Sequence, residues 1–419
     1  MLKTTQLLPG VTLRCYTDHR FKQGCLSVQL VRQMCREEAA LNALLPSVLL
    51  RGTATAPDLR AITLRLDELY GASVSGLARR IGDCQTTGFY CSFIEDRFAL
   101  EGDRILAPFL TFLEELLLQP LTEAGIFSRA FVESEKVNLI STIEAQLNNK
   151  QAYADALMLQ SLCREDSFGI PRLGTVREVS AITAEGLYGH YRRILAESPV
   201  ELFYVGSMNP ETVGSLLKPL FSRFSGNRLP LPPQTPFRPG TPGEIRKTME
   251  ITQGKLSMGF VTPIDTPDPR FAAMQLCGTL LGGVTGKLFT HLREELSLCY
   301  EISASYRPSK GILKVSAGID PENEQKVRSL ILRELEDCAA GKFSSEEAEA
   351  ARQELLSGLQ TVHDSPGSIE GYYATAALSA RPRTPEEYAR ALEAVTPEQI
   401  AEAASTVRLH TVCFLKGGC

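Results

Sequence analysis

Short stretches of the chain alternate apolar and polar residues, and the stretches between them repeat apolar residues every three or four positions. Alternation is typical of strands with one buried face, and the longer spacing is typical of amphipathic helices. Within residues 280–306, a glycine-rich turn precedes a short predicted helix over 287–295, and an alternating strand is predicted over 299–306. A break at 296–298 would let this strand fold back beside the helix. We therefore expect an α+β protein, with helices packed on one face of a mostly antiparallel or mixed sheet.

The order of predicted elements occurs twice along the chain. Residues 23–31 (QGCLSVQLV) and 253–261 (QGKLSMGFV) are similar alternating strands, and each precedes an apolar helix that ends in LLRG or LLGG. Near the end of each half a helix start recurs, as AITAEGL at 181–187 and AVTPEQI at 394–400, and a closing strand follows. Four matches in the same order indicate an internal duplication, so the two halves are expected to be homologous.

A proline-rich stretch separates these halves. Six prolines lie in residues 227–244, where they remove backbone donors and favour an extended chain. At 419 residues the chain is also too long for a single hydrophobic core. We therefore predict an N-terminal domain over 1–226, a linker over 227–244 and a C-terminal domain over 245–419.

Composition argues against several classes of function. The net charge of −5 offers no general attraction to nucleic acid, and no apolar run is long enough to cross a bilayer. The N-terminal residues lack the apolar core of an export signal, and the eleven cysteines are scattered without a C-x-x-C pair. A cytoplasmic protein with reduced thiols is expected, with neither nucleic acid nor membrane insertion among its interactions.

Two residues of the stretch 280–306 are candidates for binding a substrate. Arg293 lies near the end of the predicted helix, and Tyr300 lies near the start of the predicted strand. If the break folds the strand back, they place two hydrogen-bond donors at one corner, which suits a peptide carbonyl. From local sequence alone, the commoner interpretation is that Arg293 is an exposed cation and Tyr300 a half-buried aromatic residue, with no role in binding. His291 and Glu295 have a spacing compatible with two metal ligands, although such a pair is more often solvated.

The duplication, the order of elements and the segment LLGGVTGKLFTHLREELSLCY resemble the pitrilysin/insulinase-type zinc peptidases. This family includes the mitochondrial processing peptidase and bacterial heterodimeric peptidases. The resemblance covers nearly the whole chain, and it is most specific where a tyrosine follows the arginine of L-R-E by seven residues. It implies one half of a peptidase clamshell, built from two α+β domains. It also implies that Arg293 and Tyr300 contact the substrate backbone near the scissile bond.

The N-terminal half departs from the pattern of this family. Active members carry H-x-x-E-H on the first helix, where two histidines hold zinc and the glutamate activates a water. The matching sequence here is ALLPS, with Ala43 and Ser47 in place of the histidines and Pro46 in place of the glutamate. Neither a metal ligand nor a base remains, and Pro46 is expected to disturb the helix.

The third zinc ligand of the family is a glutamate on a later helix. A long helix predicted over 122–153 carries two candidates, Glu135 and Glu144, but neither would hold zinc without the histidines. No metal and no other cofactor is therefore expected in this chain, and no zinc-peptidase activity is expected of the chain alone.

Two functions are compatible with the similarity to the zinc peptidases and with the missing H-x-x-E-H motif. The first is a substrate-binding, non-catalytic subunit of a heterodimeric zinc metallopeptidase. A homologous partner with H-x-x-E-H would supply zinc and the general base, and the two chains would close around an extended peptide. The alternative is a catalytically inert scaffold or peptide-binding protein, which could form a homodimer.

Overall fold

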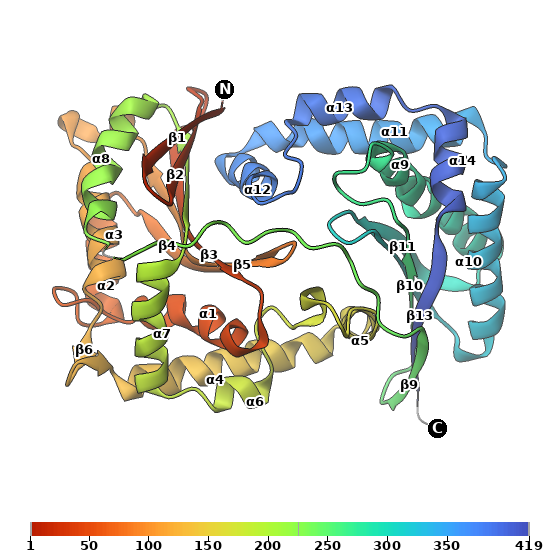
Figure 1. Ribbon diagram of the computed structural model, residues 1–419, viewed down its shortest axis with the longest axis horizontal. Coiled ribbons are helices and arrows are strands. Elements are labelled where there is room, and N and C mark those ends of the chain that lie inside the picture. The colour runs from red at the N-terminus through yellow and green to blue at the C-terminus, as the bar shows by residue number, and fades with distance from the viewer. Residues whose placement is uncertain (1, 225, 418–419) are drawn as a thin grey trace. The chain divides into compact units, whose positions relative to one another are not determined.

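The computed structural model describes residues 2–224 and 226–417, which form two compact units (Figure 1). Unit 1 comprises the described residues of Met1–Glu144, Ile170–Pro233 and His363–Leu378. Unit 2 comprises those of Ala145–Gly169, Gln234–Val362 and Ser379–Cys419. Each unit has its own sheet, its own helices and its own core.

Unit 1 is built on a six-stranded sheet in the order β1-β2-β8-β3-β5-β4. Neighbouring strands are antiparallel except β2 and β8, which are parallel. The strands are β1 (Leu2–Leu8), β2 (Val11–Thr17), β3 (Gln23–Gln33), β4 (Ser73–Ile81), β5 (Cys84–Ile94) and β8 (Val200–Gly206). A separate two-stranded ribbon joins β6 (Thr122–Glu123) and β7 (Ile126–Phe127).

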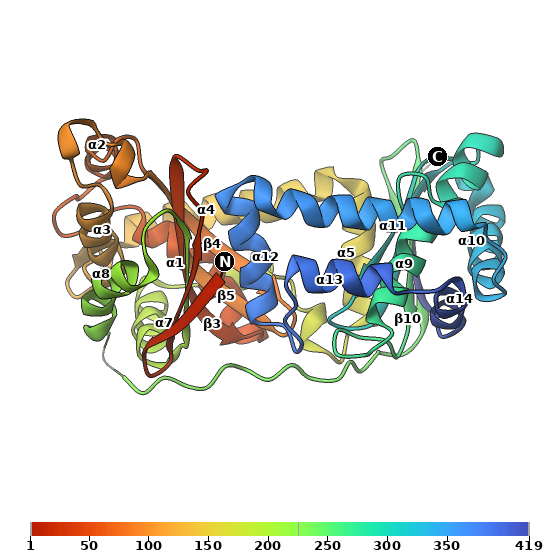
Figure 2. The same cartoon turned by 90° about the horizontal axis from the view of Figure 1, so that it is seen from above.

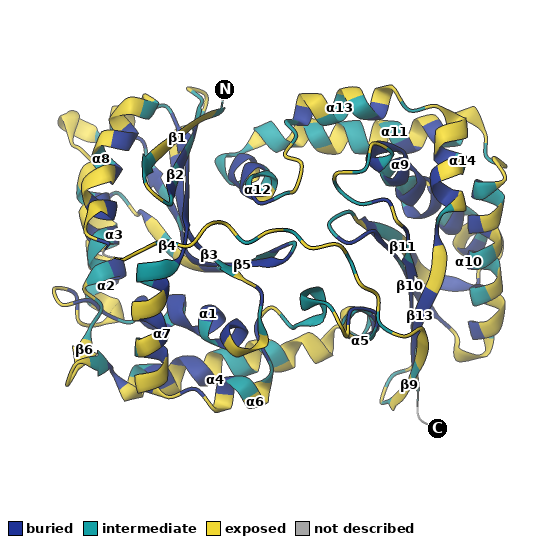
Figure 3. Ribbon diagram, viewed as in Figure 1, coloured by how far each residue is buried: buried dark blue, intermediate teal, exposed yellow. Residues whose placement is uncertain are grey.

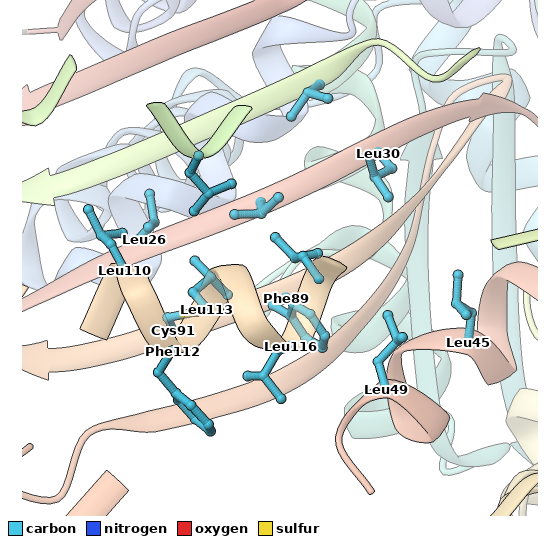
Figure 4. Packing of buried hydrophobic residues seen from close by; sticks show 14 of the residues in the cluster. Leu26, Leu30, Leu45, Leu49, Phe89, Cys91, Leu110, Phe112, Leu113 and Leu116 are labelled. Atoms are coloured by element: carbon cyan, nitrogen blue, oxygen red, sulfur yellow. The ribbon is translucent and has the colours of Figure 1, made fainter. Parts of the chain in front are cut away.

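Helices cover one face of this sheet and enclose the main core of unit 1. They are α1 (Arg36–Leu49), α2 (Leu59–Glu68), α3 (Leu106–Leu118), α4 (Arg129–Ala145), α6 (Val176–Ser180), α7 (Ala184–Glu197) and α8 (Pro210–Ser222). Figure 4 shows Leu26 and Phe89 of the sheet next to Leu113 and Leu116 of α3. This burial of apolar side chains is the main favourable contribution to the fold of the unit.

Unit 2 repeats this design with a five-stranded sheet in the order β11-β12-β10-β13-β9. Its strands are β9 (Gly243–Met249), β10 (Gly254–Val261), β11 (Cys299–Arg307), β12 (Ile312–Ile319) and β13 (Arg408–Gly417). Its helices are α5 (Lys150–Leu162), α9 (Phe271–Gly282), α10 (Glu324–Ala339), α11 (Ser345–Gln360), α13 (Pro385–Glu393) and α14 (Pro397–Ser405). Helices α11 and α13 lie side by side in both views (Figures 1 and 2).

The two sheets correspond strand by strand. The series β2-β8-β3-β5-β4 of unit 1 matches β9-β13-β10-β12-β11 of unit 2, and in each series only the first pair is parallel. The similar strands of the sequence, QGCLSVQLV and QGKLSMGFV, are β3 and β10 and hold the same place in the two sheets. The predicted α+β class and the internal repeat are therefore confirmed.

Two helices belong to a different unit from the one that their place in the sequence suggests. Helix α5 comes from the N-terminal half and packs on β10 and β13, whereas α12 (Pro366–Ala377) comes from the C-terminal half and packs on β3 and β8. The predicted division at 227–244 therefore differs from the compact units in residues 145–169 and 363–378.

The physical reason for this exchange is that each sheet has an apolar second face. Strand β3 is buried at eight successive positions, so side chains on both faces of the sheet are covered, whereas a single core would bury only every second one. Figure 3 shows the central strands as buried. On the second sheet, a side chain at Gly259 would collide with Met158 and Leu162 of α5, so glycine allows the close approach of this helix. Each exchanged helix thus removes a second apolar face from water.

Candidate functional site

Helix α1 carries the three positions that correspond to the zinc motif, Ala43, Pro46 and Ser47. The helix continues through Pro46 to Leu49, so the expected disturbance does not break it. Proline has no N–H to donate to the carbonyl of Asn42, four residues earlier. The hydroxyl of Thr87 on β5 donates to that carbonyl instead, at 2.7 Å, and satisfies it. The prediction for Pro46 was wrong because a side chain from the sheet replaces the missing backbone donor.

Zinc does not fit these residues. Ala43 and Pro46 are buried, Ser47 is half-buried, and none of the three offers the nitrogen, thiolate or carboxylate ligand that zinc requires. Of the two candidates for a third ligand, Glu135 contacts Arg51 at 3.2 Å and Asn138 at 3.1 Å, and Glu144 is exposed. Across residues 2–224 and 226–417, no group of three histidine, cysteine or acidic side chains is placed to hold a metal ion.

A buried hydrogen-bond network lies on the core side of the same helix. Asn42 donates to Gln85 at 2.9 Å, and its amide oxygen lies 2.7 Å from Nε2 of His190 on α7. Arg193 donates to Nδ1 of His190 at 3.0 Å and to Glu38 at 2.9 Å. Because arginine only donates, Nδ1 is the acceptor and the ring is neutral, with its proton on Nε2. Burial agrees with this, since it lowers the pKa of His190 to about 4.

This network is structural, and sequence reasoning missed it. It ties α1 to α7 and β5 through neutral side chains, the cation Arg193 and one buried acid, Glu38, which Arg32 also contacts at 2.7 Å. An asparagine inside the apolar run of α1 was the one available signal, because a buried amide needs partners.

Arg293 lies on a helix of unusual geometry. The predicted helix over 287–295 is present, but its part Phe289–Glu295 is a π-helix, and Leu296 donates to the carbonyl of His291 at 3.1 Å, five residues back. Such wider turns are uncommon and often occur at functional sites. The Arg293 side chain is exposed, and its guanidinium carbon lies 4.8 Å from the centre of the Phe289 ring.

Tyr300 follows two further irregularities of the backbone. Ser297 has a φ of 51°, a left-handed conformation that is strained for a residue with a side chain. Strand β11 then begins at Cys299, and its register against β12 shifts between Cys299 and Glu301, so Tyr300 is the extra residue of a β-bulge. Bulges redirect side chains and are frequent beside active sites. The predicted break and the strand after it are therefore present, with Tyr300 turned out of the regular alternation.

The tyrosine hydroxyl has a partner that the sequence did not suggest. Tyr300 is 51% exposed and donates to Asp320, the residue after β12, at 3.0 Å. This hydrogen bond raises the pKa of Tyr300 above its usual value. Asp320 could have been found only from the pairing of β11 with β12, because Cys299 lies opposite Ile319. No hydrogen bond within the described part of the chain joins Arg293 to Tyr300.

Charged side chains fix the π-helix from its buried side. Lys287 is buried and lies 3.6 Å from Glu334 and 3.5 Å from Glu347. Nδ1 of His291 lies 2.8 Å from Glu334. His291 is therefore directed at α10 and does not form a pair of metal ligands with Glu295. The exposed Arg293 projects from a helix that these contacts hold in place.

Comparisons with known proteins agree with this geometry. Residues 181–355 match the family described as "Peptidase M16 inactive domain". The chain is also 29% identical over 411 residues to the "Probable inactive metalloprotease YmfF" of Bacillus subtilis strain 168, covering 97% of this chain and 96% of that protein.

Residues 181–355 carry an M16 peptidase domain of the inactive type.

Solved structures extend the similarity of this protein to the whole fold. A conserved protein from Enterococcus faecalis V583 has a TM-score of 0.91 at 28% identity, and the match covers 100% of this chain and 99% of the other. A chain of Complex III2 from Candida albicans, determined with Inz-5 bound, has a TM-score of 0.76 at 14% identity, covering 99% and 95%. The second likeness concerns the fold alone.

These findings confirm the predicted resemblance to the M16 family and place the chain beside a relative named as inactive. The protein is metalloprotease-like, and the domain matched by residues 181–355 is the inactive type. No helix among the described residues is both long enough and apolar enough to cross a membrane. The roles of Arg293 and Tyr300 remain predictions, and they are taken up below.

Proposed function

We propose that this protein is the substrate-binding, non-catalytic subunit of a heterodimeric zinc metallopeptidase that processes peptides. The observation that supports this most is a contrast between two segments. Helix α1 has Ala43, Pro46 and Ser47 where zinc and its base would be held, whereas Arg293 and Tyr300 are exposed on a segment with three departures from regular geometry. Such strain is retained where function needs it.

The work would be divided between two related chains. A homologous partner with H-x-x-E-H would hold zinc and supply the general base, which this chain lacks. The C-terminal domain of this chain would supply Arg293, whose planar guanidinium forms two hydrogen bonds with a carbonyl or carboxylate oxygen. A fixed cation beside the carbonyl under attack stabilises the negative charge that develops there.

The edge of the second sheet offers a place for an extended peptide. Strand β11 is the first strand of its sheet and pairs only with β12 there, so one side of its backbone has no neighbouring strand within unit 2. A peptide added along this side would form main-chain hydrogen bonds that do not depend on its sequence. Tyr300 lies at the start of β11 and Arg293 seven residues before it, so both would act at one end of the added strand.

A second function has one observation in its favour. The chain of Complex III2 from Candida albicans shares this fold along nearly the whole length. A catalytically inert scaffold, or a homodimer that binds peptides without cutting them, is therefore the alternative. A scaffold has no need of an exposed Arg293 on a π-helix next to the strained Ser297, which favours the peptidase subunit.

Reconstitution separates these functions. We expect that the purified chain mixed with an H-x-x-E-H homologue encoded in the same genome cleaves a library of unstructured decapeptides, and that a zinc chelator abolishes the cleavage. The chain alone is expected to cleave nothing, because it supplies neither metal nor base. A complex with the homologue whose cleavage rate equals that of the homologue alone would contradict the proposal and favour the scaffold.

A further inference from the structure

Within residues 2–224 and 226–417, several tyrosines donate their hydroxyl proton to a carboxylate, and three of these pairs share one geometry. The pairs are Tyr70 with Asp103 at 2.7 Å, Tyr204 with Glu95 at 2.8 Å, and Tyr300 with Asp320 at 3.0 Å. An ionised carboxylate has no proton to give, so the tyrosine must be the donor in each pair. The phenolic oxygen then keeps its lone pairs, and any further strong partner must be a donor.

In two of these pairs the further partner is a backbone N–H. Leu100 donates its N–H to the oxygen of Tyr70 at 3.2 Å, and Met208 donates its N–H to the oxygen of Tyr204 at 3.2 Å. The carboxylate, the hydroxyl and the backbone N–H form a chain in which every group has a partner of the right kind. The protein thus uses one arrangement twice to bind a main-chain amide.

The third pair, Tyr300 with Asp320, shares the hydrogen bond to a carboxylate but differs in the second partner of the hydroxyl oxygen. No group among the described residues donates to the oxygen of Tyr300, and the ring is 51% exposed. The β-bulge places Tyr300 outside the regular alternation at the start of the edge strand β11, with its hydroxyl beside Asp320 at the end of β12 and its ring open to solvent. A main-chain amide of another polypeptide can therefore take the place that Leu100 and Met208 take within this chain.

We propose that Asp320 is a positioning residue that holds the proton of Tyr300, so that the oxygen of Tyr300 accepts a backbone N–H from the bound peptide. This deepens the proposed function and rests on it. Arg293 then donates to a peptide carbonyl and Tyr300 accepts from a peptide N–H, so the pair binds both an acceptor and a donor of the peptide backbone. The sequence alone suggested two donors for one carbonyl, whereas Asp320 makes Tyr300 an acceptor.

The arrangement also sets a chemical requirement on the ligand. A peptide has to present an N–H at the residue that meets Tyr300, so a proline at that residue is rejected because it has no such proton. The hydroxyl stays protonated at neutral pH, since Asp320 raises the pKa of Tyr300. The acceptor is therefore a neutral phenol, and the preference does not depend on the charge of the peptide side chains.

An ester scan tests this directly. The probe is a decapeptide selected from a random display library for binding to the full chain, resynthesised with each amide in turn replaced by an ester. An ester removes one N–H and keeps the shape of the backbone. At one position we expect the ester to weaken binding to the natural chain about tenfold, the value of one hydrogen bond.

Variants of Tyr300 and Asp320 test whether this loss of binding comes from their hydrogen bond. In Tyr300→Phe the same ester is expected to cost less than about twofold, because the acceptor is absent. In Asp320→Ala the ester is expected to weaken binding by about threefold or less, because the freed hydroxyl rotates. Asparagine at this position still accepts from Tyr300, so in Asp320→Asn most of the ester's effect on binding is expected to return. Glu322→Ala, an exposed acid two residues on, is the matched control and keeps the full tenfold effect.

Each other outcome overturns the inference. An ester profile that is the same in the natural chain and in Tyr300→Phe shows that Tyr300 accepts no amide. A tenfold effect that survives in Asp320→Ala shows that Asp320 positions nothing. If the library yields no binding peptide, peptide binding itself fails, and the inference fails with the proposed function.

Discussion

Replacing Glu370 with alanine is expected to destabilise unit 1 by about 3 kcal/mol. Glu370 lies on the exchanged helix α12 and is only 1% exposed. Its carboxylate accepts from Ser27 at 2.6 Å, from Gln29 at 3.1 Å and from Arg79 at 2.8 and 2.9 Å. Alanine removes the carboxylate that accepts from Ser27 and Arg79 and leaves Gln29 with only the hydroxyl oxygen of Ser27, at 3.2 Å, while Ser27 and Gln29 are themselves buried.

Urea denaturation followed by circular dichroism measures this effect as a lower midpoint of the transition. Glu393→Ala replaces an exposed glutamate of the same half of the sequence and is expected to shift stability by less than about 0.5 kcal/mol. Equal midpoints for Glu370→Ala and Glu393→Ala would show that the buried carboxylate does not fasten α12 to its sheet. A loss in Glu370→Ala with an unchanged slope would show that stability alone has changed.

Arg293→Ala is expected to lower the turnover of the reconstituted peptidase by about 100- to 1000-fold. The guanidinium is proposed to meet the carbonyl under attack, and removing one preorganised donor at such a place has effects of this size. Arg293→Lys keeps the charge but not the planar pair of donors, so it is expected to recover about a tenth of the natural rate. Steady-state cleavage of the selected decapeptide by the two-chain complex gives these values.

Assembly has to be measured with the same samples. Arg293 is exposed and stacks on Phe289, so Arg293→Ala is expected to elute with the partner in size-exclusion chromatography as the natural chain does. Arg333→Ala, which removes an exposed arginine of α10, is the matched control and should keep the natural rate. Natural turnover in Arg293→Ala would remove the proposed role of this residue.

Much of the fold could be predicted because it depends on local patterns that occur twice. The strands β3 and β10 and the helix starts at 181–187 and 394–400 carry similar residues, and the duplicated sheet follows from them. The glycine-rich segment before Arg293 likewise indicated the family. Such patterns are set by neighbours in the sequence and by the side of an element that is buried.

The exchange of helices could not be predicted, because the sheet face that a helix covers is a tertiary choice. One long helix was expected over 122–153, but α4 ends at Ala145 and α5 begins after Asn149, which caps it by accepting from Ala152 at 2.9 Å. The apolar positions alone showed neither this break nor that the second helix belongs to another sheet.

Two contacts at the candidate site could not be predicted from the sequence, for the same reason. Pro46 was expected to disturb α1, but Thr87, forty-one residues later, supplies a donor to the carbonyl of Asn42. Tyr300 was taken as a free donor, but Asp320 accepts its proton through the pairing of β11 with β12. Both contacts join residues distant in sequence, and local propensity contains no information about them.

The proposed function requires that this chain binds a peptide and that α1 has lost the residues that hold zinc. The most direct test is a crystal of the chain grown with zinc, with diffraction measured on both sides of the zinc absorption edge. The account predicts no anomalous peak beside Ala43, Pro46 and Ser47 of α1. A zinc peak at these residues would contradict it.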